Sequence, residues 1–233
     1  MSQPRPPPPL VVVRDGALAA GLFWRLARAV RALGTEGLRR TYQTAFWFDL
    51  GAPACLAEEA VLALRPLAWA ARSGRLAGVE WWLSRMRTSD VQVDFHQDRD
   101  EVLFGRSGRT RCPAQGSVLF LNRCRGGALA VTAQPADDAN PARAPLPFDG
   151  DLVRPRPNRL ALFPGDAIHG VLDARGEIPR GRLAPPTPLR LALVMNWWRA
   201  RPEGRPRFED AGVYAALRAP RPRVITRPDP ESS

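Results

Sequence analysis

The sequence predicts a mainly β domain with helical support, in which a jelly-roll core is flanked by helices near the N-terminus. About eight short segments rich in β-branched and aromatic residues follow two amphipathic segments. Strand-like and helix-like segments do not alternate, which argues against a parallel, doubly wound sheet. The chain has 233 residues, of which 45% are hydrophobic, and this is enough for the core of one domain. Together these observations favour a jelly roll of antiparallel strands.

Composition divides the chain into three parts. A proline-rich leader at residues 1–14 precedes a single domain at residues 15–218, and a proline- and arginine-rich tail at residues 219–233 is expected to be flexible. Within the domain, we expect residues 15–89 to supply helical and strand support and residues 90–199 to form the jelly-roll core.

The segments before residue 90 predict two strands and two helices. Residues 10–13 are a short apolar run that predicts an early strand. Apolar residues recur at three- and four-residue spacing through residues 16–33, which predicts an amphipathic helix. Residues 41–50 are β-branched and aromatic, as is typical of a strand. A second helix is predicted at residues 54–64, where two acidic residues in the early turns suit the helix dipole.

The second half of the chain contains further strands separated by polar loops. Strands are predicted at residues 117–122, 128–133, 158–163, 167–172 and 189–198, and a short helix at residues 208–217. Loops are predicted at residues 105–116, 134–157 and 173–188. Gly126 and Gly127 predict a tight, hairpin-like turn that pairs the two strands on either side of it.

Charge and residue usage exclude or disfavour several classes of function. The net charge is +11, and all 34 basic residues are arginine. Because the arginines are scattered along the chain, a compositional bias explains the charge as well as a binding surface would, and this disfavours a nucleic-acid partner. Without lysine, no Schiff base can form on a side-chain amine. The cysteines Cys55, Cys112 and Cys124 are widely spaced and indicate neither a disulfide framework nor a zinc site.

The sequence also predicts the compartment. It contains no apolar run of about 18 residues or more, the length that a membrane-spanning helix requires. The first ten residues lack the charged and then apolar pattern of a secretory signal. We therefore expect a cytoplasmic protein without membrane association.

Residues 91–98, VQVDFHQD, are the segment in which we expect the chemistry. Apolar residues alternate there, so His96 and Asp98 project from the same face if the segment is a strand. The only other histidine, His169, lies in a second strand-like segment. Two imidazoles and one carboxylate form a metal site with open coordination positions, which suits Fe(II) that must bind oxygen and an organic acid. Asp94 and Asp100 are interpreted as supporting or solvated residues.

A succession of motifs then resembles a known family. His96 and Asp98 are followed by SVLFLNRCRGGALAV, RLALFPGDAIHGV and LRLALVMNWW. This order resembles the Fe(II)- and 2-oxoglutarate-dependent dioxygenases, and most closely their prolyl-hydroxylase-like branch. In that branch a strand similar to "YLN" precedes a Gly-Gly turn, and an apolar strand ending in Phe-Pro precedes the distal histidine. The resemblance covers residues 90–199 and implies a double-stranded β-helix.

The resemblance implies roles for particular residues. His96, Asp98 and His169 would bind Fe(II), and a basic residue on the last core strand would bind the distal carboxylate of 2-oxoglutarate. Arg190 fits this role and shares one face of its strand with Asn196, so both are candidate cosubstrate-binding residues. The separation of His169 and Arg190, 21 positions, is longer than is usual in the family. An insertion would explain it, or one of two other arginines would take the role. These are Arg180 and Arg182.

The resemblance further implies an activity. The expected reaction is hydroxylation of a substrate C–H bond, with consumption of 2-oxoglutarate and O2 and release of succinate and CO2. Fe(II), 2-oxoglutarate and O2 are the implied cofactors and cosubstrates, and ascorbate is a further candidate. Related halogenases have a small residue in place of Asp98, so the intact carboxylate favours hydroxylation. A peptidyl proline, a free amino acid and another small molecule are the candidate substrates.

Three other functions stay open. A nucleic-acid demethylase of the same superfamily would suit the basic charge, but such enzymes usually have a second arginine at the position of Asn196. A cupin-like enzyme would bind its metal through more histidines than this chain has. In a catalytically silent jelly-roll binding module, His96 and His169 would be ordinary buried histidines.

Overall fold

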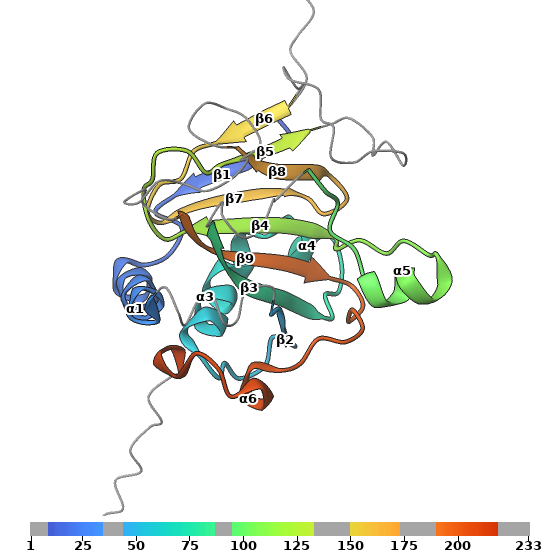
Figure 1. Cartoon of the computed structure of the whole chain (residues 1–233), viewed down its shortest axis with the longest axis horizontal. Helices are drawn as coiled ribbons and strands as arrows, with labels where there is room; N and C mark the ends of the chain where they lie inside the picture. Colours follow the sequence, from blue (N-terminus) through green and yellow to red (C-terminus); the bar gives the residue numbers. More distant parts are fainter. Residues whose placement is uncertain (1–8, 35–43, 87–94, 133–149, 173–189, 219–233) are drawn as a thin grey trace, which may run out of the picture.

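Two antiparallel sheets form the body of the molecule (Figure 1). This computed structural model describes residues 9–34, 44–86, 95–132, 150–172 and 190–218. Within these ranges, one sheet has six strands in the order β1-β7-β4-β9-β3-β2, and the other has three in the order β6-β5-β8. The mainly β class that the sequence predicts is therefore confirmed.

Six strands lie within two residues of a predicted segment. In the described part of the strand predicted at residues 41–50, only residues 46–48 form one, and the strands at residues 78–86 and 150–153 were not predicted. The larger sheet contains β1 (Val12–Asp15), β2 (Phe46–Phe48), β3 (Gly78–Met86), β4 (Gln115–Phe120), β7 (Arg159–Pro164) and β9 (Arg190–Trp198). The smaller sheet contains β5 (Ala128–Thr132), β6 (Gly150–Val153) and β8 (Ile168–Leu172). Because β1 pairs with β7, the last residues of the expected leader at 1–14 belong to the larger sheet.

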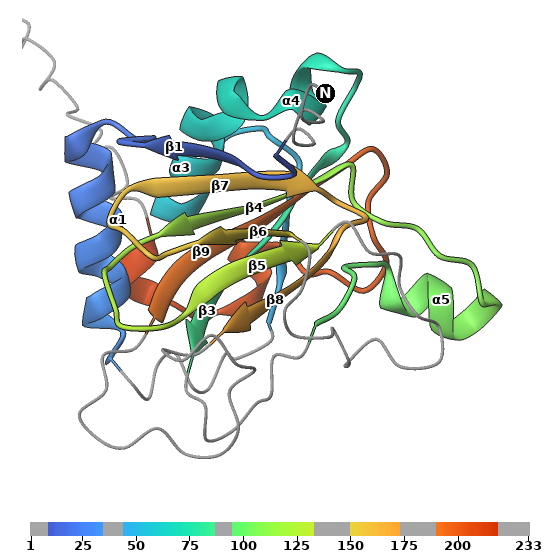
Figure 2. The same cartoon turned by 90° about the horizontal axis from the view of Figure 1, so that it is seen from above.

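The helices are short and lie outside the sheets. They are α1 (Ala20–Ala32), α3 (Leu56–Leu64), α4 (Trp69–Arg72), α5 (Glu101–Ser107) and α6 (Phe208–Ala211), with 3-10 turns η1 (Arg65–Leu67) and η2 (Ala215–Leu217). Figure 2 shows α3 and α4 on one side of the larger sheet and β5, β6 and β8 on the other. Among the helices that the structure describes, none has both the length and the apolar character needed to cross a bilayer.

Helix α1 begins four residues later than its periodicity predicts because Asn158 holds the preceding residues in another conformation. The Asn158 side chain accepts a hydrogen bond from Leu18 N at 2.9 Å and donates one to Leu18 O at 2.8 Å. Its backbone oxygen also accepts from Ala17 N at 3.1 Å. These contacts join the start of α1 to the turn before β7, 140 residues away in the sequence.

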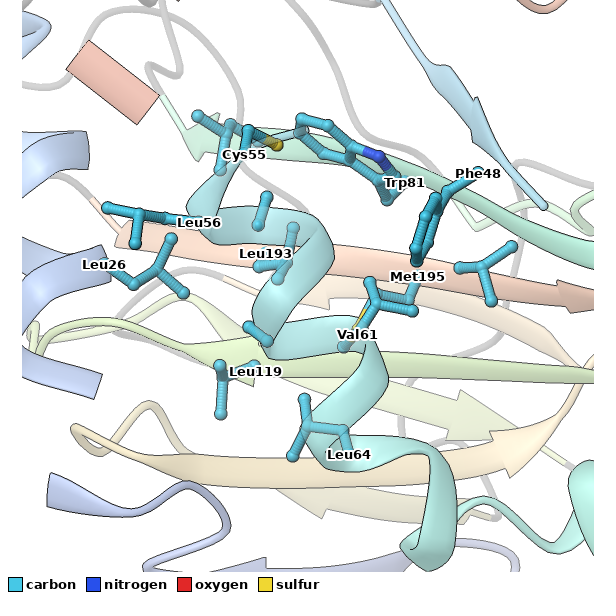
Figure 3. Close-up of a cluster of buried hydrophobic side chains, with 14 of the residues drawn as sticks. Leu26, Phe48, Cys55, Leu56, Val61, Leu64, Trp81, Leu119, Leu193 and Met195 are labelled. Atoms are coloured by element: carbon cyan, nitrogen blue, oxygen red, sulfur yellow. The ribbon is translucent and has the colours of Figure 1, made fainter. Parts of the chain in front are cut away.

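The main core lies between the helices and the outer face of the larger sheet (Figure 3). Alanines of α3 that are fully buried, Ala57 and Ala60, let this helix pack closely on the sheet. Leu119 of β4 and Leu193 of β9 cover it from the sheet side. Burial of this apolar surface is the main contribution to the stability of the fold.

A second apolar cluster fills the space between the two sheets. Val118 and Phe120 of β4 and Val194 of β9 meet Leu129 and Val131 of β5 there. The larger sheet is therefore buried on both faces, which explains why β4 is buried at every position. This interior between the sheets is where the candidate site lies.

Two of the predicted loops contain regular structure. The predicted loop at residues 105–116 is wrong at both ends, because α5 extends to Ser107 and β4 begins at Gln115. Asp100 caps α5 by accepting a hydrogen bond from Leu103 N, and Gly108 ends the helix in the left-handed conformation at φ 67°. The loop predicted at residues 134–157 is wrong for residues 150–153. These residues form strand β6, which pairs with β5. The predicted loop at residues 173–188 lies outside the described residues.

The predicted pairing across Gly126 and Gly127 is wrong. Strand β4 pairs with β7 and β9, whereas β5 pairs with β6 and β8 in the other sheet. Both glycines have positive φ, 83° and 72°, and Gly127 N donates to Leu172 O at 2.7 Å. The glycines therefore turn the chain from one sheet to the other instead of closing a hairpin.

We expect the stability of the protein to fall as pH rises, because of Glu58 in the first turn of α3. Its side chain is 2% exposed and accepts hydrogen bonds from Ala54 N at 2.7 Å and Trp81 Nε1 at 3.4 Å. Burial raises the pKa of Glu58 from 4.5 to about 7. Between these values the folded state binds one more proton than the unfolded state, so stability is greatest below the lower value and declines toward the upper one.

Glu58→Gln should remove this dependence. Between the two pKa values, each rise of one pH unit should lower the free energy of unfolding of the natural protein by about 1.4 kcal/mol relative to that of the variant. Urea unfolding of both proteins at pH 5, 6, 7 and 8 measures this difference. A difference that stays constant from pH 5 to pH 8 would contradict the assignment.

Candidate metal centre

His96, Asp98 and His169 converge beside the interior between the sheets, where the side chain of His169 is 9% exposed, that of Asp98 16% and that of His96 44%. One candidate ligand atom from each residue lies within 4.8 Å of the other two. His96 Nε2 is 3.4 Å from Asp98 Oδ1, and His169 Nε2 is 3.5 Å from Asp98 Oδ2. The first distance approaches the separation of about 3 Å expected for neighbouring ligands of one ion at bond lengths of about 2.1 Å, and His169 Nε2 faces the other oxygen of the same carboxylate. The convergence that the H-x-D pattern predicts is present.

Backbone pairing brings the two histidines together. His96 N donates to His169 O and His169 N donates to His96 O, both at 2.9 Å. This antiparallel bridge places the two imidazole centroids 4.5 Å apart. Within residues 95–98 the bridge is the sole ladder contact, so the regular strand predicted for residues 91–98 is not seen there, and residues 91–94 lie outside the described chain.

The imidazole of His169 directs its Nε2 to Asp98. Its Nδ1 lies 3.0 Å from Ala167 O, and a hydrogen bond donated from Nδ1 leaves Nε2 free to coordinate. Phe163 packs against the ring at a centroid distance of 4.9 Å. Burial lowers the pKa of His169 against the opposing charge of Asp98, which favours the neutral imidazole that a metal requires.

Asp98 is held in its ionised form. Burial alone would raise its pKa, but His169, His96 and a hydrogen bond from Asn196 outweigh burial and hold the pKa of this carboxyl well below its usual range. The carboxylate is 16% exposed. Two imidazoles and one anionic carboxylate therefore face a common point, as the chemistry of a facial metal site requires.

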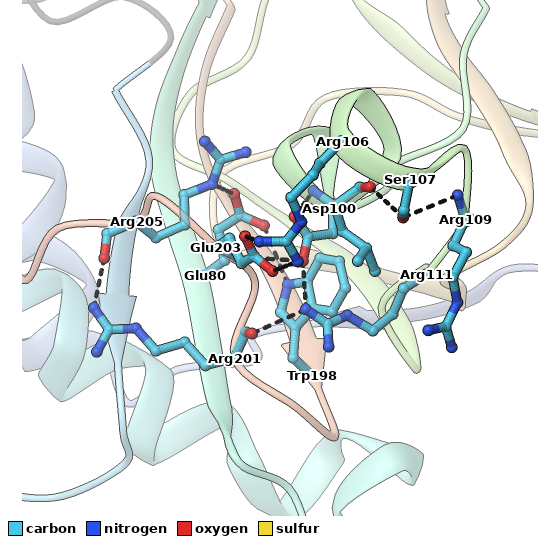
Figure 4. Close-up of polar contacts among 11 residues, drawn as sticks. Glu80, Asp100, Arg106, Ser107, Arg109, Arg111, Trp198, Arg201, Glu203 and Arg205 are labelled. Carbon is cyan, nitrogen blue, oxygen red and sulfur yellow. Dashed lines mark hydrogen bonds and ion pairs between the residues drawn. The ribbon is translucent and has the colours of Figure 1, made fainter.

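The chain that follows Asp98 is fixed by a buried carboxylate (Figure 4). Asp100 is 1% exposed, forms an ion pair with Arg111, and accepts hydrogen bonds from Leu103 N at 3.1 Å and Glu203 N at 3.2 Å. Arg106 binds both carboxylate oxygens of Glu203 at 2.9 and 2.7 Å. The connection after β9 is thereby joined to α5, immediately beyond the candidate ligand.

A second buried carboxylate anchors the same connection to β3. Glu80 is 4% exposed, accepts a hydrogen bond from Trp198 Nε1 at 3.1 Å and forms an ion pair with Arg205. Glu80 lies on the interior face of β3, directly opposite Asn196 of β9. The sequence analysis did not identify either carboxylate network. Glu80 and Ser84 are an even number of residues apart in β3, so they share a face of the strand, and this face is the interior one.

Arg190, the first residue of β9, is buried at another part of the interior. It is 3% exposed, and its Nη1 donates to Ser84 Oγ at 3.1 Å. Its Nε has no hydrogen-bond partner, and no carboxylate of the described residues forms an ion pair with the guanidinium. Burial lowers the pKa of Arg190 to about 10, so it stays charged at neutral pH.

The surroundings of Arg190 are closely packed. Its guanidinium carbon lies 5.1 Å from the centroid of the Phe120 ring, and a Cβ on Gly127 would lie 2.9 Å from Arg190 Cδ. The glycine turn that carries the chain between the sheets thus also makes room for this arginine. The alternative candidates Arg180 and Arg182 lie outside the described residues.

Known structures share this architecture. A prolyl-4-hydroxylase from Pseudomonas putida is 22% identical, with a TM-score of 0.50 over 82% of this chain and 89% of the other. The epimerase SnoN from nogalamycin biosynthesis is 17% identical (TM-score 0.49, 82% and 79% covered), and HygX from Streptomyces hygroscopicus is 14% identical (TM-score 0.48, 83% and 85% covered). No protein-family model and no curated protein matches the sequence. The first of these likenesses shows that the chain has the fold of the bacterial prolyl-4-hydroxylase.

Arg111→Met should destabilise the protein because it leaves the Asp100 carboxylate buried without its charged partner. The two backbone donors remain, so we expect a loss of about 1–3 kcal/mol in the free energy of unfolding. Arg106→Met is the matched control, since the Arg106 side chain is 65% exposed and its ion pair should contribute less than about 1 kcal/mol. Denaturant unfolding of the three proteins measures both losses, and equal losses would contradict the role given to Asp100.

Proposed function

We propose that this protein is an Fe(II)- and 2-oxoglutarate-dependent oxygenase that hydroxylates a C–H bond of a peptide, an amino acid or another small molecule. One observation carries the proposal. Two histidines and a carboxylate converge beside the interior that holds a buried arginine without a carboxylate partner among the described residues. The fold shared with a prolyl-4-hydroxylase supports it. We further propose that the two facing sheets are the double-stranded β-helix, or jelly roll, that the sequence predicts.

The donor set fits Fe(II). His96, Asp98 and His169 supply two nitrogen atoms and one oxygen atom, the combination typical of non-haem iron sites that keep coordination positions open. A structural zinc site would be closed by a fourth protein ligand. Among the described residues, these three are not joined by a fourth residue of the kinds that bind metals, namely histidine, cysteine, aspartate or glutamate. This arrangement favours a catalytic centre over a structural one.

Arg190 fits the distal carboxylate of 2-oxoglutarate. A buried guanidinium without an anionic partner is unfavourable, and a carboxylate that accepts from its free donors would relieve this cost. The planar fork can bind a carboxylate through two parallel hydrogen bonds. Ser84 would hold the remaining side of the guanidinium, and the apolar surroundings would strengthen the ion pair by excluding water.

The residues then have separate tasks in the reaction. When bound, iron and 2-oxoglutarate supply the oxidising chemistry, in which substrate, 2-oxoglutarate and O2 become hydroxylated substrate, succinate and CO2. His96, Asp98 and His169 hold the metal at one point of the interior. Arg190 orients the cosubstrate, and the apolar residues between the sheets keep water from the reacting atoms.

His96→Ala and His169→Ala should each abolish stoichiometric metal binding, because two remaining ligands bind a divalent ion weakly. Anaerobic titration calorimetry with Fe(II) measures binding, and succinate release from 2-oxoglutarate measures turnover. Asp166→Ala, which removes an exposed carboxylate from the turn before β8, is the control and should keep one equivalent of metal. Natural protein that binds no iron and releases no succinate would favour the silent binding module.

Arg190→Met should weaken 2-oxoglutarate binding by about 10- to 100-fold, the equivalent of one charge-assisted hydrogen-bonded pair, and leave the metal in place. The KM for 2-oxoglutarate and the metal content of the variant test both parts. Arg199→Met removes an exposed arginine just after the same strand and should change neither value. An unchanged KM in Arg190→Met would move the role to Arg180 or Arg182.

A further inference from the structure

Asn196 occupies a rigid position beside the candidate ligand Asp98. It lies in the interior strand β9, where it pairs with Glu80 of β3 and Gly116 of β4. Its side chain is 2% exposed. The backbone at this position is therefore fixed by two ladders, and the side chain has little freedom.

The two cross-strand neighbours of Asn196 do not compete with Asp98 for its side-chain amide. Glu80 is already bound by Trp198 and Arg205, and Gly116 has no side chain. A Cβ at Gly116 would lie 2.4 Å from the Phe163 ring, so a larger residue does not fit there. Asn196 Nδ2 donates to Asp98 Oδ2 at 3.0 Å.

The orientation of the amide serves Asp98 at a cost to Asn196 itself. With Nδ2 directed to the carboxylate, Asn196 Oδ1 is buried without a hydrogen-bond partner. An unsatisfied buried acceptor is unfavourable. The contact with Asp98 offsets this cost, because a hydrogen bond to a charged group is stronger than one between neutral groups.

Asp98 needs support from a side chain because its backbone has little. Ladder pairing in the described part of its segment ends at His96. The next fixed point is Asp100, which is bound to Arg111. Between these two anchors, the hydrogen bond from Asn196 is the contact from the larger sheet that defines how the carboxylate is turned.

We infer that Asn196 is a positioning residue that presents Asp98 to the metal through one oxygen. By occupying Oδ2, the amide leaves Oδ1 as the ligand atom and disfavours chelation through both oxygens. A carboxylate that binds through one oxygen leaves a coordination position free for the cosubstrate or oxygen. The inference rests on the proposed function in that Asp98 must bind a metal.

The test uses Mn(II) and two measurements on the full chain. Asn196→Leu removes the donor at similar side-chain volume, and we expect its Kd for Mn(II) to rise about 10- to 100-fold, as is typical when a ligand loses its hydrogen-bonding support. Water-proton relaxation by bound Mn(II) reports how many positions are open to water. It should decrease in the variant if Asp98 then chelates through both oxygens.

Gln115→Leu is the matched control. Gln115 is also a fully buried amide with one unpartnered atom, Nε2, but its Oε1 accepts from Ala70 N on the helical side of the sheet. This variant should lose stability and keep the Mn(II) affinity of the natural protein. A loss of affinity in both variants would indicate general destabilisation and overturn the inference.

The remaining outcomes are also decisive. Folded Asn196→Leu with an unchanged Kd would overturn the positioning role, and a raised Kd with unchanged relaxation would overturn the single-oxygen part. If Asn196→Leu does not fold, Asn196→Ala takes its place with the same measurements. Natural protein that binds no Mn(II) would instead count against the proposed metal centre.

Discussion

Two backbone hydrogen bonds between His96 and His169 are the contact on which the candidate site depends. They join the segment that carries the H-x-D pattern to β8, 73 positions later in the sequence. A shift of this pairing by one residue would turn one histidine to the opposite face. The side-chain contacts around the site, such as the hydrogen bond from Asn196 to Asp98, refine an arrangement that the backbone has already set.

Strand β9 connects the site to the hydrophobic core. Leu193, Met195 and Trp197 face the helices and belong to the main core, whereas Arg190 and Asn196 face the interior between the sheets. Because β3 pairs with the whole of this strand and β4 with residues 192–197, its polar residues have fixed positions relative to each other. Core packing on one face thereby fixes the positions of the candidate site residues on the other.

Two of the errors in predicting the fold came from contacts that are distant in the sequence, and one came from the short length of a helix. The glycines at 126 and 127 suggest a hairpin locally, but β4 finds its partners in β7 and β9. Helix α5 was missed because its seven residues are too short for a clear apolar period, although Asp100 and Gly108 provide its caps. Residues 150–153 form strand β6 because they pair with β5, and their own sequence has little of the alternation of apolar and polar residues that predicts a strand.

The sequence by itself determined the residue types available for chemistry and the faces on which they lie. Two histidines, an aspartate two residues after the first, and an arginine at the start of the last long strand define the candidates, and the two-residue period of a strand divides β9 into its two faces. Only the tertiary structure decided which strands pair, that Asp98 receives its hydrogen bond from Asn196, and that Asp100 and Glu80 anchor the connection after β9. The physical reason is that periodicity is a property of neighbouring residues, whereas strand partners and buried polar pairs are selected by the packing of the whole chain.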